Sequence, residues 1–113
     1  MFVDKMFPCR YIKGMTYKIR STEYFDKWLA KVKDHQFHAR IVNRVERLEF
    51  GYFGDCKTIA QNLFELRLFF GPGFRVYYTL RGSEIIFLLL GGDKSTQAKD
   101  IEKATELLQN LEE

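Results

Sequence analysis

Long apolar segments are missing from this 113-residue sequence. No uninterrupted apolar run approaches the roughly 20 residues that a membrane-spanning helix needs, and the longest block, Ile85 to Leu90, has the length of a strand. The N-terminal segment MFVDKMFPCRYIKGM also lacks the continuous apolar core and the small-residue cleavage site of a signal peptide. We therefore expect a soluble, cytoplasmic protein without a membrane partner.

Cysteine and histidine are scarce. The two cysteines, Cys9 and Cys56, are too few for a disulfide-stabilised scaffold and lack the spacing of metal ligands, which predicts two free thiols. The two histidines, His35 and His38, have no neighbouring cluster of Cys or Glu that would suggest zinc. We therefore expect no metal and no cofactor.

Net charge is small as well. A formal charge of +3 does not by itself indicate a nucleic-acid partner. The distribution says more, because residues 1–20 carry five Lys or Arg against one Asp, whereas residues 93–113 carry three Lys against six Asp or Glu. The two ends of the chain are therefore opposite in charge.

The chain has the length of one domain with a single core, which its 46% hydrophobic content can build. Residues 1–14 show neither helical nor strand periodicity, so we expect a flexible N-terminal arm followed by one domain over residues 15–113. No internal repeat or low-complexity stretch divides that domain.

The next segment has the pattern of one short strand and two helices. Tyr17 and Ile19 alternate with basic residues, which predicts a strand, and Ser21 or Thr22 can cap the helix that follows. A turn around residues 34–36 leads into the second helix. Apolar positions recur at helical spacing in both helices: Phe25, Trp28, Leu29 and Val32 in the first, and Phe37, Ile41, Val45 and Leu48 in the second.

The second helix also carries a stripe of arginines, Arg40, Arg44 and Arg47. Such a stripe is commonly a solvated helix face, and it can also contact a partner protein or RNA. The sequence leaves these alternatives open.

Two strand-like stretches, FELRLFF and GFRVYYTLR, are joined by the turn GPG, after a loop, GYFGDCKTIAQN, that carries Lys57. Because side chains on a strand alternate between faces, one face of this hairpin is apolar, with Phe64, Leu66, Leu68, Phe70, Phe74, Val76, Tyr78 and Leu80. We expect the other face to be open and cationic, with Glu65, Arg67, Phe69, Arg75, Tyr77, Thr79 and Arg81. Guanidinium groups on a rigid open face can bind phosphate through two hydrogen bonds, so the hairpin predicts a phosphate-binding surface.

The run from Ile85 to Leu90 shows no alternation, which predicts a central strand buried on both faces. Gly91 and Gly92 end it, and Ser95 or Thr96 can cap a last helix, whose inward stripe is Ile101, Ala104, Leu108 and Leu111. The predicted fold class is therefore α+β, in the order β-α-α-β-β-β-α. We expect a mainly antiparallel sheet of about four strands, with an N-terminal helical hairpin and a C-terminal helix.

Several blocks occur together in one order: FDKWL in the first helix, ELR and GPGFRVYY in the hairpin, and LLLGGDKSTQAKDI leading into the last helix. In this combination the sequence resembles the RelE/ParE superfamily of toxin-antitoxin toxins, and more narrowly the HigB-like addiction-module killer proteins, over residues 15–111. The resemblance implies a small RelE-like domain that acts as an mRNA interferase, an endoribonuclease that enters the ribosomal A site and cleaves the mRNA there. It also implies a cognate antitoxin, usually a small helix-turn-helix-type protein, through which alone operator DNA is bound.

The resemblance also indicates site residues. The hairpin arginine of a Gly-aromatic-Arg motif falls on Arg75, and the basic residue after the last strand falls on Lys94. Where the RelE pattern has two lysines on the strand before the turn, this chain has Glu65 and Arg67. Tyr77 is the nearest substitute for the tyrosine of that pattern.

Metal-free cleavage by the 2′-hydroxyl needs a base, cations that stabilise the phosphorane-like state, and an acid for the leaving 5′-oxygen. Arg67 and Arg75 suit the stabilising role, and Lys94 can bind phosphate or supply a proton. The candidates for the base are Asp93, Asp100, Glu65 and Tyr77. The predicted catalytic set is Arg67, Arg75, Lys94, Asp93 and Tyr77, and the further RNA-binding residues are Lys57, Arg81 and Lys99.

Structural interpretations stand beside these roles. Arg67 and Arg75 can pair with Glu65 or Glu84 across the sheet, and Asp93 can serve as a turn or cap residue. Because the RelE set is incomplete, two other functions stay open: a ParE-like poison of DNA gyrase, and a degenerate module that only binds its antitoxin.

Overall fold

The computed structural model describes residues 16–111. The elements are β1 (Lys18–Ser21), α2 (Glu23–Ala30), α3 (His35–Arg47), β2 (Cys56–Ala60), β3 (Leu63–Arg67), β4 (Arg75–Arg81), β5 (Ile85–Gly92) and α4 (Gln97–Leu111), with short 3-10 turns at Leu48–Phe50 and Lys94–Thr96. The predicted arm at residues 1–14 lies outside the described residues, so the division into arm and domain stays a prediction.

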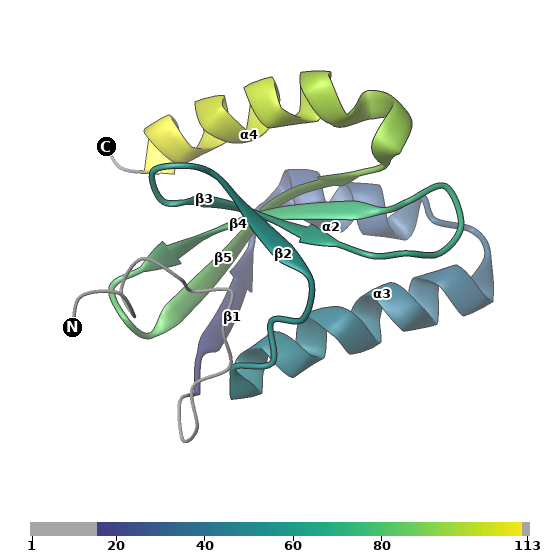
Figure 1. The fold of residues 1–113 in the computed structure, drawn as a ribbon, viewed down its shortest axis with the longest axis horizontal. Coiled ribbons are helices and arrows are strands. Elements are labelled where there is room, and N and C mark those ends of the chain that lie inside the picture. Colours follow the sequence, from purple (N-terminus) through teal and green to yellow (C-terminus); the bar gives the residue numbers. More distant parts are fainter. Residues whose placement is uncertain (1–15, 112–113) are drawn as a thin grey trace.

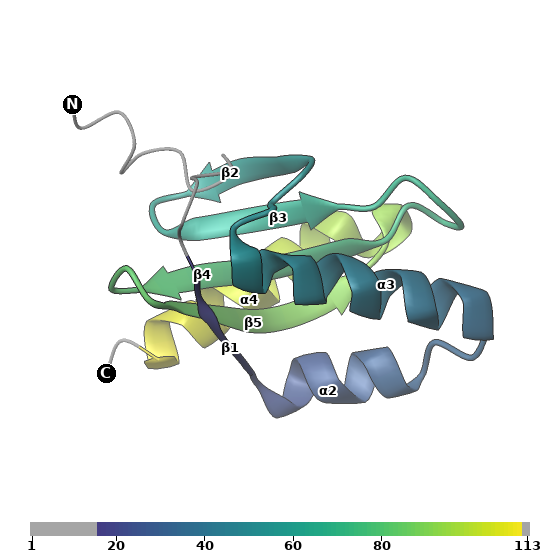
Figure 2. The same cartoon turned by 90° about the horizontal axis from the view of Figure 1, so that it is seen from below.

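The strands form one sheet in the order β1-β5-β4-β3-β2. β1 is parallel to β5, and the other neighbours are antiparallel. α4 lies on one side of this sheet and α2 and α3 lie on the other (Figure 1), where they run along the sheet when seen from below (Figure 2). The predicted α+β class is confirmed, and so is the central place of β5, between β1 and β4.

The strand count needs a correction, because the sheet is mixed and has five strands. The additional strand, β2, lies in the segment predicted as a loop around Lys57 and pairs with β3 at the edge of the sheet. Its register shifts between Thr58 and Ala60, and most of its side chains are exposed. An exposed edge strand has little apolar alternation, so its sequence resembles that of a loop.

Capping side chains fix where the helices begin. Thr22 caps α2, as predicted, because its hydroxyl accepts a hydrogen bond from the backbone of Phe25 at 3.1 Å. Asp34 caps α3, where its carboxylate accepts from the backbone of Gln36 and Phe37. The prediction of Ser95 or Thr96 as the cap of the last helix is wrong. Asp93 caps a 3-10 turn that precedes α4, because its carboxylate accepts from the backbone of Ser95 at 2.8 Å.

Both faces of the sheet are covered by apolar cores. The larger core lies against α2 and α3 and includes Phe25, Ile41, Leu48, Phe64, Leu66, Val76 and Tyr78. The second core lies under α4 and includes Leu63, Tyr77, Leu89, Ala104, Leu107 and Leu108. The expected open cationic face is therefore wrong over most of its length, because the apolar stripe of α4 must itself be buried and packs on that face.

Three sequence expectations concern cysteine, metal and membrane. Cys56 is disulfide-bonded, so the prediction of a free thiol is wrong for this residue, and Cys9 lies outside the described residues. Within residues 16–111, no group of three or more His, Cys, Asp or Glu side chains could hold a metal ion. No helix in the same range has the length and apolar character needed to cross a membrane.

Candidate functional site

The candidate site lies at the end of the sheet where β3 ends, β4 begins and β5 leads into α4 (Figure 1). The register pairs Arg67 with Arg75, and Arg75 with Gly92. Paired residues on an antiparallel ladder point to the same face, so the two arginines are neighbours on the side of α4. A Cβ built on Gly73, in the β3–β4 turn, would lie 3.5 Å from Cβ of Lys94 and 3.6 Å from Nη1 of Arg75. The backbone positions of the three predicted cations are therefore close together.

Arg67 is held by a carboxylate. Its Nε and Nη2 each lie 3.1 Å from a different carboxylate oxygen of Asp55, and about a third of each side chain is exposed. This paired geometry is the strong form of an arginine–carboxylate contact. The prediction that Arg67 pairs with Glu65 or Glu84 is therefore wrong, because its partner is Asp55. Arg67 is rigid but largely neutralised.

Arg75 is nearly buried beside the fully buried Glu65, with 3.8 Å between its Nε and Oε2 of that carboxylate. The same oxygen accepts hydrogen bonds from the hydroxyl of Tyr77 at 3.1 Å and from the amide of Gln97 in α4 at 2.7 Å. Arg75 also donates to the carbonyl of Gly73 at 3.1 Å. These contacts confirm the structural interpretation of Arg75 and Glu65 as a pair.

The buried pair still has unused hydrogen-bonding capacity. Within residues 16–111, Oε1 of Glu65 and Nε of Arg75 have no hydrogen-bond partner. Buried polar atoms of this kind are uncommon in folded proteins and cost free energy. Both atoms are themselves buried, so this cost belongs to the folded pair.

Tyr77 was expected on the open face, and the structure corrects this. Its ring is fully buried under α4, and its hydroxyl donates to Glu65. Burial and the neighbouring carboxylate of Glu65 raise the pKa of Tyr77 well above its ordinary range. A phenol that stays protonated is a hydrogen-bond donor and a poor base, so Tyr77 fits the role of positioning Glu65.

Two aspartates near the start of α4 differ in their surroundings. Asp93 is occupied as the cap of the turn, where it accepts from both the backbone and the hydroxyl of Ser95. Asp100 lies against the backbone of Gly92 and accepts a hydrogen bond from Thr96. Burial raises the pKa of Asp100, and the charge of Asp93 raises it further, although the hydrogen bond from Thr96 opposes the shift.

The predicted RNA-binding residues are not all near this site. Lys57 is paired in register with Glu65, so it projects from the same face of the sheet at the exposed edge. Lys99 is exposed in the first turn of α4. Arg81 lies at the other end of β4, about 20 Å from Arg75 by the rise of a strand, and donates to the carbonyl of Leu111.

Sequence reasoning missed two residues of the site, Asp55 and Gln97. Asp55 meets Arg67 only because β2 pairs with β3, and that strand was not predicted. Gln97 reaches Glu65 from the first turn of α4, over 32 positions in sequence. No pattern in the sequence marks either contact, because both depend on how separate elements pack.

Comparisons with known proteins agree with this fold. A family model described as "Phage derived protein Gp49-like (DUF891)" matches residues 23–109. An uncharacterised protein of Haemophilus influenzae is 47% identical over 97 residues, which are 86% of this chain and 98% of that protein. A mutant of the Escherichia coli toxin RelE, solved in the free state, superposes with a TM-score of 0.56 over 81% of this chain and 97% of its own, at 16% identity. At that identity the superposition shows a shared fold.

Proposed function

Since the chain belongs to the phage-derived Gp49-like family and has a RelE-like fold, we propose that it is the toxin of a type II toxin-antitoxin system. In this proposal it is a HigB-like mRNA interferase of the cytoplasm that cleaves mRNA in the ribosomal A site. A cognate antitoxin of the small helix-turn-helix type would neutralise it. The cleavage would proceed without a metal, by attack of the 2′-hydroxyl on the adjacent phosphate.

One observation carries the proposal: Arg67, Arg75 and Lys94 gather at one end of the sheet, beside the start of α4. Lys94 is exposed and has no ion-pair partner within residues 16–111. Arg75 also has a buried donor, Nε, that meets no hydrogen-bond acceptor in the described part of the chain. Cations fixed by a scaffold stabilise developing negative charge without reorganising, and one such donor commonly contributes about 3 kcal/mol to transition-state stability.

The surroundings of the four candidate bases favour Asp100. Asp93 is occupied as a cap, Tyr77 stays protonated, and Glu65 is fully buried. Asp100 is only partly buried, and its raised pKa makes it a stronger base than an ordinary aspartate. Asp100 would therefore accept the 2′-hydroxyl proton, while Lys94 protonates the leaving 5′-oxygen.

Mapping of mRNA 5′ ends after induction tests this function. The proposal expects cuts inside translated codons, which disappear when initiation on that mRNA is blocked. Lys94 is exposed, and Lys94→Gln should abolish both the toxicity and the cuts. Arg20→Gln, at an exposed position on the distant strand β1, should leave both unchanged.

Other outcomes would identify the alternatives. Intact mRNA together with a DNA-damage response would indicate a ParE-like gyrase poison, which shares this fold and acts through a protein contact. Growth unaffected by expression without the partner would indicate a module that only binds its antitoxin. Either result contradicts the nuclease.

A further inference from the structure

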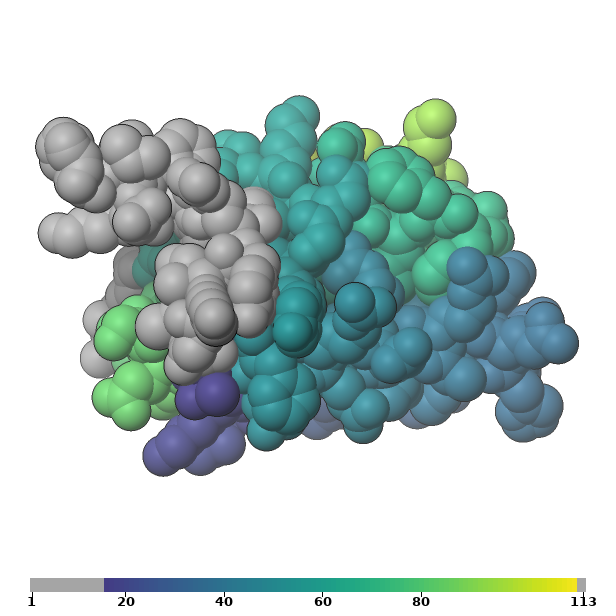
Figure 3. Space-filling model, turned by 60° about the horizontal axis from the view of Figure 1, so that its bottom comes forward, coloured from purple at the N-terminus to yellow at the C-terminus, as the bar shows by residue number. Residues whose placement is uncertain are grey.

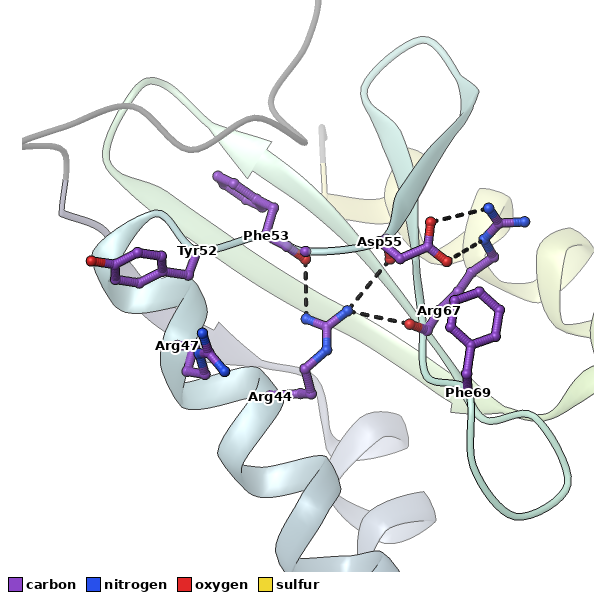
Figure 4. Close-up of a pocket in the computed structure, with 8 residues that line it drawn as sticks. Arg44, Arg47, Tyr52, Phe53, Asp55, Arg67 and Phe69 are labelled. Carbon is purple, nitrogen blue, oxygen red and sulfur yellow. Dashed lines mark hydrogen bonds and ion pairs between the residues drawn. The ribbon is translucent and has the colours of Figure 1, made fainter.

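A cationic pocket lies between α3, the loop that follows it and the end of β3 (Figure 4). Its volume is about 350 Å³, and its walls include Arg44, Arg47, Tyr52, Asp55, Arg67 and Phe69. Figure 3 shows the face of the molecule on which α3 lies beside these segments. Arg67 lines this pocket and also belongs to the candidate site.

Arg44 gives the pocket its fixed shape. Its guanidinium donates to the carbonyls of Phe53 at 3.0 Å, Arg67 at 3.2 Å and Asp55 at 3.5 Å (Figure 4). Burial and the charge of Arg47 lower the pKa of Arg44. These bonds tie the loop before β2 and the end of β3 to α3, so the walls are preformed and Arg44 itself is used in the structure.

The other groups of the pocket are suited to a ligand that is both anionic and aromatic. Arg47 is exposed, lies 5.7 Å from the ring centre of Tyr52, and has no ion-pair partner within residues 16–111. Arg67 lies 5.9 Å from the ring centre of Phe69. Phe69 is 75% exposed and Tyr52 is 44% exposed. Three arginines against one aspartate leave the pocket with a charge of +2.

Single-stranded RNA fits this combination better than an acidic peptide does. Proteins hold unpaired bases by stacking them on aromatic rings and arginine planes, and they hold the backbone with cations. An acidic peptide would use the arginines but would leave exposed rings such as Phe69 without a function. The volume lies at the small end of the range for ligand sites, which suits a single nucleotide.

We propose that this pocket binds one nucleotide of single-stranded RNA, with its base against Phe69 and its phosphate on Arg47. The inference rests on the proposed function, because it makes the pocket an RNA subsite next to the cleavage site. Arg67 lies between the two, so the bound nucleotide would be close to the cleaved phosphate and would help to set the path of the strand.

Direct binding separates this inference from the nuclease proposal. The probe is a short, fluorescent single-stranded oligoribonucleotide with 2′-O-methyl groups, which cannot be cleaved, and the readout is fluorescence anisotropy of the full chain over a range of salt. Arg47→Gln and Phe69→Ala are the test variants. As controls, Arg20→Gln makes the same change on β1, and Tyr24→Ala removes an exposed aromatic ring from α2, both away from the pocket.

Phe69→Ala should weaken binding about tenfold, because a base loses its stacking partner. Arg47→Gln should lower the magnitude of the slope of log affinity against log salt by about 0.7, the contribution of one phosphate contact on a single strand. The two control variants should bind as the unaltered chain does. Thermal denaturation of each variant checks that the fold is kept.

Three results would overturn the inference: no binding of the probe by the unaltered chain, equal losses in the test and control variants, or losses only with an acidic peptide as the probe. If cleavage of mRNA persists while the pocket variants bind normally, only the pocket is refuted. If the pocket variants lose binding while no mRNA is cleaved in cells, only the nuclease proposal is refuted.

Discussion

Tyr77→Phe removes one hydroxyl from the buried cluster around Glu65. The hydroxyl donates to Oε2 of Glu65 at 3.1 Å, and neither side chain has any exposure through which water could replace the bond. A hydrogen bond to a charged group contributes about 1.5–3 kcal/mol, and the ring itself is unchanged. We therefore expect the free energy of unfolding to fall by about 2 kcal/mol, which corresponds to a loss of about 8 °C in Tm for a domain of this size.

The adjacent Tyr78 provides a matched control. Tyr78 is also fully buried, but its hydroxyl donates to the sulfur of Cys56 at 3.3 Å. Sulfur is a weak acceptor, so Tyr78→Phe should cost less than about 1 kcal/mol. Urea denaturation at neutral pH, with unchanged m values, measures the loss in the free energy of unfolding of each variant. A Tyr77→Phe loss smaller than that of Tyr78→Phe would refute the account of Glu65 as a buried, hydrogen-bonded carboxylate.

Three further predictions concern the buried tyrosines, Gly92 and Asp100. Because their pKa values are raised, Tyr77 and Tyr78 should stay protonated in an ultraviolet titration until the fold is lost, and stability should fall above about pH 10, where tyrosines of the unfolded chain ionise. Gly92→Ala should cost about 1–3 kcal/mol in urea denaturation and impair cleavage, because its Cβ would lie 2.8 Å from Cγ of Asp100; unchanged stability would show that α4 yields easily. Asp100→Asn should slow cleavage at least about 100-fold and remove the acidic limb of the pH–rate profile, which in the unaltered protein should lie above the usual aspartate range.

Patterns of hydrophobic residues were sufficient to predict most of the fold. The stripe with Ile41 on α3 and the unalternating run of β5 predicted their burial correctly, because burial of apolar surface dominates such segments. The strand β2 was missed, since Lys57 and its neighbours are exposed and carry little apolar alternation.

The site was predicted in part. The parity of the hairpin placed Arg67, Arg75 and Tyr77 on one face correctly, but it could not show that α4 covers that face. The hairpin pattern also could not show which polar side chains would pair with one another. Asp55 and Gln97 reach Arg67 and Glu65 through packing between elements, which one sequence does not specify.

Cleavage on purified ribosomes tests the central claim most directly. The substrate is a ribosome-bound mRNA with an empty A site, and the same mRNA without ribosomes serves as the reference. The account predicts single-turnover cutting within the A-site codon, slowed about 100-fold or more by Arg75→Gln or Lys94→Gln. Uncut mRNA on the ribosome, or cutting by both variants at the rate of the unaltered protein, would contradict it.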